Sequence, residues 1–186
     1  EIGSGLVGSE MCIRDRLDNI SRIHKPALNK IMITASRAGN AGIVWWAICL
    51  PFLINSNWRA TGANFVFGLA WAHLMGEIII KHIVKRVRPC HTLDDDEQLI
   101  DRPRFYSFPS GHTTASFAMV GVALMRCKVI TFMPILMLAM LIAFSRIYLR
   151  VHYLTDVIAG MILGLTCGIC SVLIFNTVVP MWFPMV

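Results

Sequence analysis

Five apolar segments constrain the fold of this chain more than any other feature of its sequence. They cover approximately residues 38–55, 60–80, 110–126, 128–148 and 155–179. A transmembrane helix needs about 20 mostly apolar residues, and fewer where its ends lie in protein. Hydrophobic residues make up 56% of the 186 residues and charged residues only 15%, which is not the balance of a soluble domain. We therefore expect an all-α, integral-membrane helical bundle of about five transmembrane helices.

The N-terminal 37 residues differ from the rest of the chain. Residues 1–16 begin with Glu1 rather than Met and resemble a translated sequencing-library adapter, so we treat them as non-native and leave them out of the fold. On that interpretation the natural start of the protein is missing. Residues 17–37 alternate apolar with basic side chains, which predicts an amphipathic helix on the membrane surface. Residues 38–180 then form one membrane-embedded domain.

Three clusters of charged and small polar residues stand at the ends of the apolar segments. They contain, in order, Lys81, Arg88 and Pro89; Pro109, Ser110, Gly111 and His112; and Ser145, Arg146, His152 and Asp156. In an up-and-down bundle all three clusters emerge on the same membrane face. Because charge is costly beside a bilayer, such clusters call for a functional explanation.

Five of these residues are suited to binding one anion, and we refer to them as the anion cradle: Lys81, Arg88, Ser110, Gly111 and Arg146. The lysine and the first arginine are nearly two helical turns apart, so both can project from one face. The Ser-Gly pair precedes a helix whose first amides have no internal partner, which favours anion binding. The second arginine offers a planar fork of donors that matches phosphate oxygens.

A structural ion-pair network between helix ends is the alternative explanation for the same charges. Such a network needs acidic partners, and only Asp156 and Glu77 are available for Lys81, Arg88 and Arg146. Glu77 lies one turn before Lys81, so it is a candidate to hold that lysine in place. The remaining excess of positive charge favours a site for an anion.

Two histidines supply the two roles that phosphoryl transfer requires, a nucleophile and a proton donor for the leaving oxygen. His152 is followed four residues later by Asp156, so one helical turn brings the carboxylate next to the imidazole. The carboxylate can then keep one ring nitrogen protonated and leave the other free to attack. His112 has no acidic partner in its own segment, which makes it the candidate acid.

These residues resemble the three-part signature of the type 2 phosphatidic acid phosphatase family, whose relatives include vanadium-dependent haloperoxidases. All eleven residues named above for the three clusters match the pattern, which spans residues 81–156. The surrounding helices resemble the compact membrane-bound branch of the family. The resemblance makes residues 38–180 a phosphatase domain.

The resemblance also implies a mechanism. His152 attacks the phosphoryl group to give a phosphohistidine, assisted by Asp156. His112 protonates the leaving lipid alcohol and later activates water. The anion cradle neutralises the equatorial oxygens of the phosphoryl group. Neither a metal ion nor a cofactor is required.

We therefore expect a multi-pass phosphatase of the bacterial inner membrane that acts on a lipid phosphate or diphosphate. Candidate substrates are phosphatidate, phosphatidylglycerol phosphate and undecaprenyl diphosphate, and the partners are membrane lipids. The net charge of +6 does not indicate nucleic acid, because no long basic arm with interleaved aromatic residues is present. A non-catalytic lipid-phosphate binding or transport protein is the alternative, since it would need the cradle but not both histidines. A soluble haloperoxidase would not need the apolar segments.

The sequence leaves the orientation in the membrane, the exact lipid and the oligomeric state open. Four basic residues between positions 17 and 37 lie on the same membrane face as the three clusters. On the opposite face lie three other basic residues, Arg59, Arg126 and Lys128. The positive-inside rule would place the site in the cytoplasm. However, the basic residues of the clusters are there to bind phosphate, so they bias the count of positive charges on each face. Related bacterial proteins often have an outward-facing site.

Several other features predict packing or solvation rather than chemistry. The acidic run at 94–97 is expected to be a solvated loop. Cys167 and Cys170 have the spacing of a redox motif but lie in an apolar segment, where we expect small packing residues. Trp45, Trp46 and Trp58 are expected near the membrane interfaces. Glycines at four-residue intervals from 160 to 168 predict close contact with a neighbouring helix.

Overall fold

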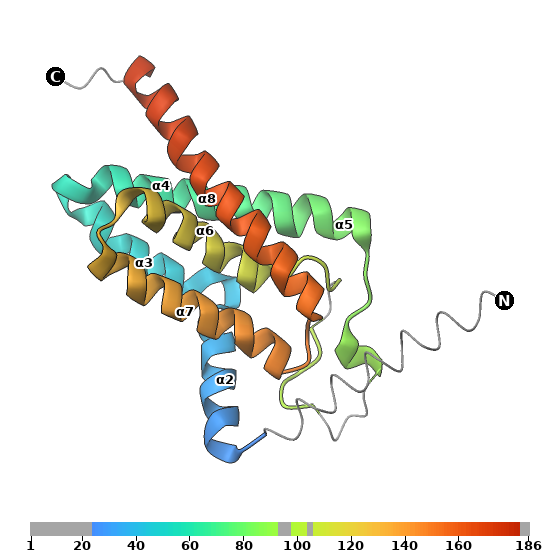
Figure 1. The fold of residues 1–186 in the computed structure, drawn as a ribbon. Coiled ribbons are helices and arrows are strands. Elements are labelled where there is room, and N and C mark those ends of the chain that lie inside the picture. The colour runs from blue at the N-terminus through green and yellow to red at the C-terminus, as the bar shows by residue number, and fades with distance from the viewer. Residues whose placement is uncertain (1–23, 93–97, 104–105, 183–186) are drawn as a thin grey trace.

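The computed structural model describes residues 24–92, 98–103 and 106–182. Within those ranges the chain forms helices and connecting loops, with no strand. The adapter-like residues 1–16 and the acidic run at 94–97 lie outside the described residues. The prediction of an all-α fold is confirmed (Figure 1).

In the part of the chain that the structure describes, three helices are long and apolar enough to cross a membrane. Helix α4 (Arg59–His73), the π-helical segment η3 (Leu74–Ile80) and α5 (Lys81–Val84) continue into one another, and together they make the first of the three, Ser56–Val84. The other two are α7 (Val129–Tyr148) and most of α8 (Leu154–Trp182). The side chains on their outer surfaces include large, exposed apolar groups, as expected for helices that face lipid.

Helices α2 (Pro26–Ala38) and α3 (Ile43–Ile54) form a pair that is bent by 58°. If this pair is one broken span, the described residues contain four candidate crossings. In Figure 1, α2 projects away from the other helices, while α3 lies among them. The bend lies at the short helical turn Asn40–Gly42, where Ala41 has a left-handed backbone with φ of 49°. An amphipathic surface helix over 17–37 stays a prediction, because only its second half is described.

Helix α6 (Gly111–Arg126) is the centre of the bundle rather than a typical lipid-facing span. It has 16 residues, too few for the approximately 20 of a full crossing, and most of its side chains are buried. The expected count of five full transmembrane helices is therefore not confirmed, because α6 and α3 are both short and α6 is enclosed by its neighbours.

Helix α8 packs closely against α6, as the glycine spacing predicts. A Cβ atom on Gly164 would collide with the carbonyl oxygen of Thr114, and one on Gly168 would collide with that of Ala118. The two backbones are therefore in contact, and larger side chains at these glycines would force the helices apart. This contact fixes the position of α8, whose first turn carries Asp156.

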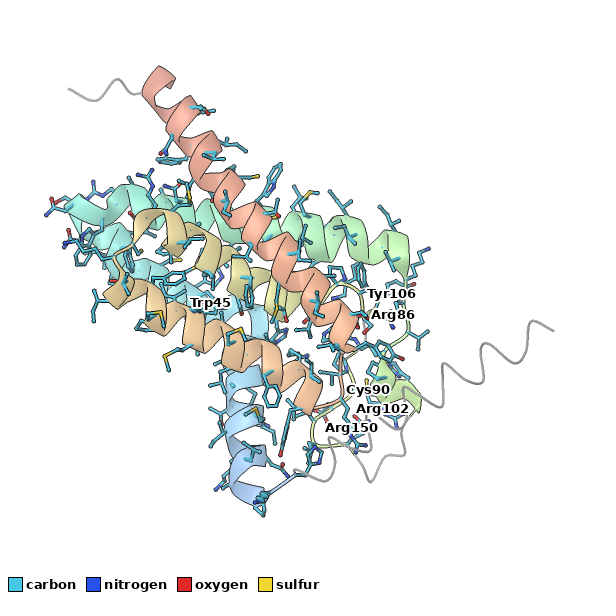
Figure 2. The ribbon with its side chains drawn as sticks, in the orientation of Figure 1. Trp45, Arg86, Cys90, Arg102, Tyr106 and Arg150 are labelled. Carbon is cyan, nitrogen blue, oxygen red and sulfur yellow. The ribbon has the colours of Figure 1, made fainter. Side chains whose placement is uncertain are left out.

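Trp45 corrects one of the interfacial predictions. Its side chain is 0% exposed and lies within the bundle (Figure 2), where its indole Nε1 donates a hydrogen bond to Ser116 Oγ at 3.1 Å. A buried tryptophan usually needs such a partner for its N–H group. Trp46 and Trp58 are exposed, at 49% and 54%.

Candidate active site

The three sequence clusters meet at one cavity, although they are far apart along the chain. The cavity has a volume of about 1360 Å³. From the clusters, the residues that line it are Lys81, Arg88, Gly111, His112, Arg146 and His152. Asp156 and Ser110 are fully buried at 0% exposure. The expectation that the clusters emerge on one side of the bundle agrees with this arrangement.

The three basic residues of the cradle are almost completely buried. Lys81, Arg88 and Arg146 are 4%, 4% and 3% exposed. Lys81 begins α5, Arg88 follows that helix and Arg146 lies in the last turn of α7. Burial is the main cause that lowers the pKa of Arg88, because taking a cation out of water disfavours its charged form. Three buried cations around one cavity favour the binding of an anion there.

Glu77 is the acidic partner of Lys81 in this structure. The lysine Nζ lies 2.7 Å from both carboxylate oxygens. The carboxylate also covers Gly111, where any side chain would collide with it. Glu77 lies in the π-helical segment that precedes Lys81, and such segments occur often at functional sites.

Ser110 caps the start of α6 but does not line the cavity. Its Oγ accepts a hydrogen bond from Thr113 Oγ1 at 3.0 Å, and its backbone N–H donates to the carbonyl oxygen of Asp156 at 3.1 Å. The backbone of Ser110 is thus bonded to the first turn of α8, whereas Gly111 lines the cavity. Of the pair, only Gly111 is therefore among the described residues that line the cavity.

His152 lies in the loop between α7 and α8 and is 2% exposed. Its Nε2 lies 2.9 Å from Nη1 of Arg88. Because arginine can only donate, Nε2 must accept, and the proton of a neutral ring must be on Nδ1. The unshared electron pair of Nε2 consequently points into the cradle, which is the tautomer a nucleophile needs.

Burial is the main cause that lowers the pKa of His152 below its ordinary value. The positive charges of Arg88 and Arg146 lower this pKa further, whereas the nearby Asp156 carboxylate opposes the shift. The ring is therefore neutral at neutral pH, when its unshared pair is available.

A serine that no spacing in the sequence indicated lies between His152 and Asp156. The distance from His152 Nδ1 to Asp156 Oδ2 is 3.7 Å, too long for a direct hydrogen bond. Ser107 Oγ donates to the same carboxylate oxygen at 2.5 Å and lies 3.4 Å from the imidazole Nδ1. The helical spacing thus brings the acid near the ring, and the Ser107 hydroxyl bridges them.

Arg86 holds the other oxygen of the same carboxylate. Its Nη1 lies 2.8 Å from Asp156 Oδ1 and 2.7 Å from Thr155 Oγ1. The guanidinium group also lies 4.0 Å from the centre of the Tyr153 ring, a cation–π arrangement. Figure 2 shows Arg86 beside the start of α8. The sequence signal available for this residue was its place within the first cluster, two positions before Arg88.

Within the described residues, one side chain forms a hydrogen bond with the imidazole of His112. In the first turn of α6, its Nε2 lies 2.8 Å from Oδ1 of Asn40. In addition, Arg146 donates a hydrogen bond to Ser36 Oγ. Both partners, Asn40 and Ser36, come from the N-terminal part of the chain, outside the three sequence clusters.

This arrangement is suited to phosphoryl transfer. It combines a buried cationic cavity, a neutral histidine aimed into the cavity with a carboxylate behind it, and a second histidine at a helix N-terminus. Fold and site together define a membrane-bound helical phosphatase. The model of the PAP2 superfamily matches residues 61–180, and the chain belongs to this superfamily.

Relatives with known activities are phosphatases of lipids. The chain is 32% identical over 151 residues to the undecaprenyl-diphosphatase of Sulfolobus acidocaldarius, covering 81% of this chain and 72% of that protein. It is 37% identical over 126 residues to the decaprenylphosphoryl-5-phosphoribose phosphatase of Mycobacterium tuberculosis, covering 66% and 63%. It is 29% identical over 157 residues to phosphatidylglycerophosphatase B of Bacillus subtilis, covering 77% and 73%.

Two crystal structures share the fold. LpxE of Aquifex aeolicus has a TM-score of 0.72 at 26% identity, over 83% of this chain and 91% of that chain. A transmembrane PAP2-type phosphatidylglycerolphosphate phosphatase of Bacillus subtilis has a TM-score of 0.73 at 22% identity, over 95% and 90%. The predictions of a multi-pass membrane protein and of a phosphoric ester hydrolase are confirmed.

Proposed function

We propose that this protein hydrolyses the terminal phosphate or diphosphate of a membrane lipid through a covalent phosphohistidine at His152. The observation that carries this proposal is the orientation of the His152 ring. Its Nε2 points to Arg88 at 2.9 Å within the cradle, and its Nδ1 faces the Ser107–Asp156 pair. A neutral imidazole held in this tautomer is an activated nucleophile.

In the first step the unshared pair of His152 Nε2 attacks phosphorus, and the bond from phosphorus to the lipid oxygen breaks. His112 gives a proton to that oxygen, so that the lipid leaves as an alcohol or as a lipid monophosphate. The ring of His152 becomes positively charged when Nε2 bonds to phosphorus. The Asp156 carboxylate stabilises this charge through Ser107 and the Nδ1 proton.

In the second step His112, now neutral, takes a proton from water while the water oxygen attacks phosphorus. The bond between phosphorus and Nε2 of His152 breaks, which returns the ring to its neutral form and releases inorganic phosphate. In both steps the cradle residues that line the cavity, Lys81, Arg88, Gly111 and Arg146, stabilise the negative charge on the phosphoryl oxygens. Glu77 holds Lys81 in position for this role.

The walls of the cavity agree with a substrate that has a long apolar tail. Trp46, Leu69, Leu74 and Ile78 line it next to the cradle. The three relatives act on lipids that differ in headgroup but share a phosphate on a long-chain lipid. We propose the same class here, with phosphatidate, phosphatidylglycerol phosphate and undecaprenyl diphosphate as candidates and the bacterial inner membrane as the location.

The test is phosphate release by the purified protein in detergent, with these three lipids as substrates. We expect release in the presence of a chelator and inhibition by vanadate, which mimics the transferring phosphoryl group. His152→Ala should lose activity by at least about a thousandfold, the scale seen when a nucleophile is removed. His82→Ala is the matched control, since His82 is exposed on α5 and lies outside the cavity lining. Full activity in His152→Ala would refute the proposal.

A further inference from the structure

The end of α2 and the turn that joins it to α3, residues 36–42, form one wall of the active-site cavity. We call this segment the elbow. Ser36, Arg37 and Ala38 are the last residues of α2, and the other four residues of the elbow form the bend. Six of the seven residues line the cavity. The elbow lies before residue 61, where the match to the superfamily model begins. The family signature therefore says nothing about what the elbow does.

The elbow contacts His112 at two points. Asn40 Oδ1 lies 2.8 Å from His112 Nε2. A Cβ atom on Gly39 would lie only 2.8 Å from Cδ2 of the same ring and 3.1 Å from Ile142 Cγ2. Glycine at position 39 thus lets the backbone pass directly beside the imidazole.

The elbow is anchored on both sides. On the α2 side, Ser36 is 2% exposed and accepts a hydrogen bond from the buried Arg146. On the α3 side, Trp45 donates to Ser116 Oγ, and that hydroxyl in turn donates to the carbonyl oxygen of His112 at 2.7 Å. Asn40 therefore approaches His112 from a segment that is fixed to the same part of the site.

We propose that Asn40 is a positioning residue for His112, and that the elbow completes the active site. The amide oxygen of Asn40 can only accept, so it binds the ring through Nε2–H. The other nitrogen, Nδ1, is then the one that gives its proton to the leaving lipid oxygen and later takes a proton from water. Asn40 does not touch the reacting atoms in this arrangement. This inference rests on the function proposed above.

The role can be separated from a merely structural one by changing the leaving group. A lipid alkoxide must be protonated as it departs, whereas nitrophenolate leaves without a proton donor. The ratio kcat/KM reports the steps up to cleavage of the phosphate ester, so it excludes the later attack by water. Short-chain phosphatidate and 4-nitrophenyl phosphate are the two substrates.

We expect Asn40→Ala to lower kcat/KM for phosphatidate by about thirtyfold, which is part of the usual contribution of a general acid. The loss with 4-nitrophenyl phosphate should be less than about threefold. Asn40→Asp keeps an acceptor oxygen and should lose less than the alanine variant. The matched control is Asn57→Ala, because Asn57 is exposed in the turn between α3 and α4.

A double variant tests whether the effect passes through His112. In the His112→Ala background, Asn40→Ala should cause no further loss with phosphatidate, because the group it orients is gone. Equal losses on the two substrates, or additive losses in the double variant, would overturn the positioning role. These outcomes leave the proposed function intact, which is overturned only by activity in His152→Ala.

Discussion

The two histidines of this active site are held in very different ways. His152 is 2% exposed, and the carboxylate behind it is held by Arg86, Ser107 and the backbone N–H of Tyr153. His112 is only half-buried and is oriented by one amide from the elbow. The proposed nucleophile thus lies in a dense polar network, whereas the proposed acid meets a side chain from the segment between α2 and α3.

The contrast follows from what each group has to do. A nucleophile must meet phosphorus at one distance and angle, and a rigid surrounding network provides that geometry before the substrate arrives. The acid must meet the oxygen of a departing lipid, which needs an open path to the membrane. The amide of Asn40 in the elbow orients the acid without closing that path.

The largest effect should come from breaking the network behind His152. Asp156→Asn removes the charge that stabilises the phosphorylated ring and leaves Arg86 without its carboxylate. We expect kcat to fall by about a thousandfold, which is less than the loss of about ten-thousandfold when the carboxylate of a serine protease triad is replaced by an amide. Steady-state kinetics with phosphatidate measures this. A loss below about tenfold would show that the carboxylate is not part of the catalytic unit.

Arg86 should have an intermediate effect. Arg86→Met removes the ion pair with Asp156, so we expect a loss of about tenfold in kcat with little change in KM, because Arg86 acts through the carboxylate and not on the substrate. Arg86→Lys should restore part of the rate. Arg59→Met is the control, since Arg59 is exposed and its guanidinium donates a hydrogen bond to the nearby carbonyl oxygen of Leu53. A change confined to KM would contradict a role through Asp156.

Ser36 lies in the elbow, the segment that also contacts His112. Ser36→Ala should have a smaller effect on the rate than Arg86→Met. It removes one hydrogen bond from Arg146, and the arginine can still bind phosphate. We expect about a threefold loss in kcat/KM, in line with the modest net value of one hydrogen bond. Inhibition by vanadate should weaken to a similar degree. A loss above about a hundredfold would mean that α2 is as essential to the cradle as the three clusters.

The smallest predicted effect concerns the protonation of His152. Its lowered pKa means that the ring stays neutral as the pH falls through 6.5, the ordinary value for histidine, and becomes protonated only at lower pH. Nitrogen NMR of histidine-labelled protein should show a neutral ring at pH 6 with its proton on Nδ1. The signal is assigned by its disappearance in His152→Gln. Titration at or above pH 6.5 would contradict the buried, cation-flanked environment.

The sequence predicted those parts of the site that depend on short spacing or on topology. The end of one helix and the start of the next share a membrane face, so the convergence of Lys81, His112 and Arg146 follows from the order of the segments. The i to i+4 spacing of Glu77 and Lys81 likewise predicted their ion pair, which the structure contains.

Other contacts had no local pattern from which they could be predicted. Asn40 meets His112 across 72 residues, and Arg86 meets Asp156 across 70. Such pairs depend on how helices pack and on backbone bends, including the left-handed Ala41 in the elbow. The same packing placed Trp45 in the core rather than at an interface.

Chemical trapping of the phosphorylated enzyme tests the central claim most directly. His112→Ala should still react with 4-nitrophenyl phosphate but should lose phosphate slowly, because the base that activates water is missing. Rapid quenching with ³²P-labelled substrate should give a label that is stable to alkali, labile to acid and located on His152. No label should form in His152→Ala. Turnover without a labelled histidine, or label that persists in His152→Ala, would contradict the account.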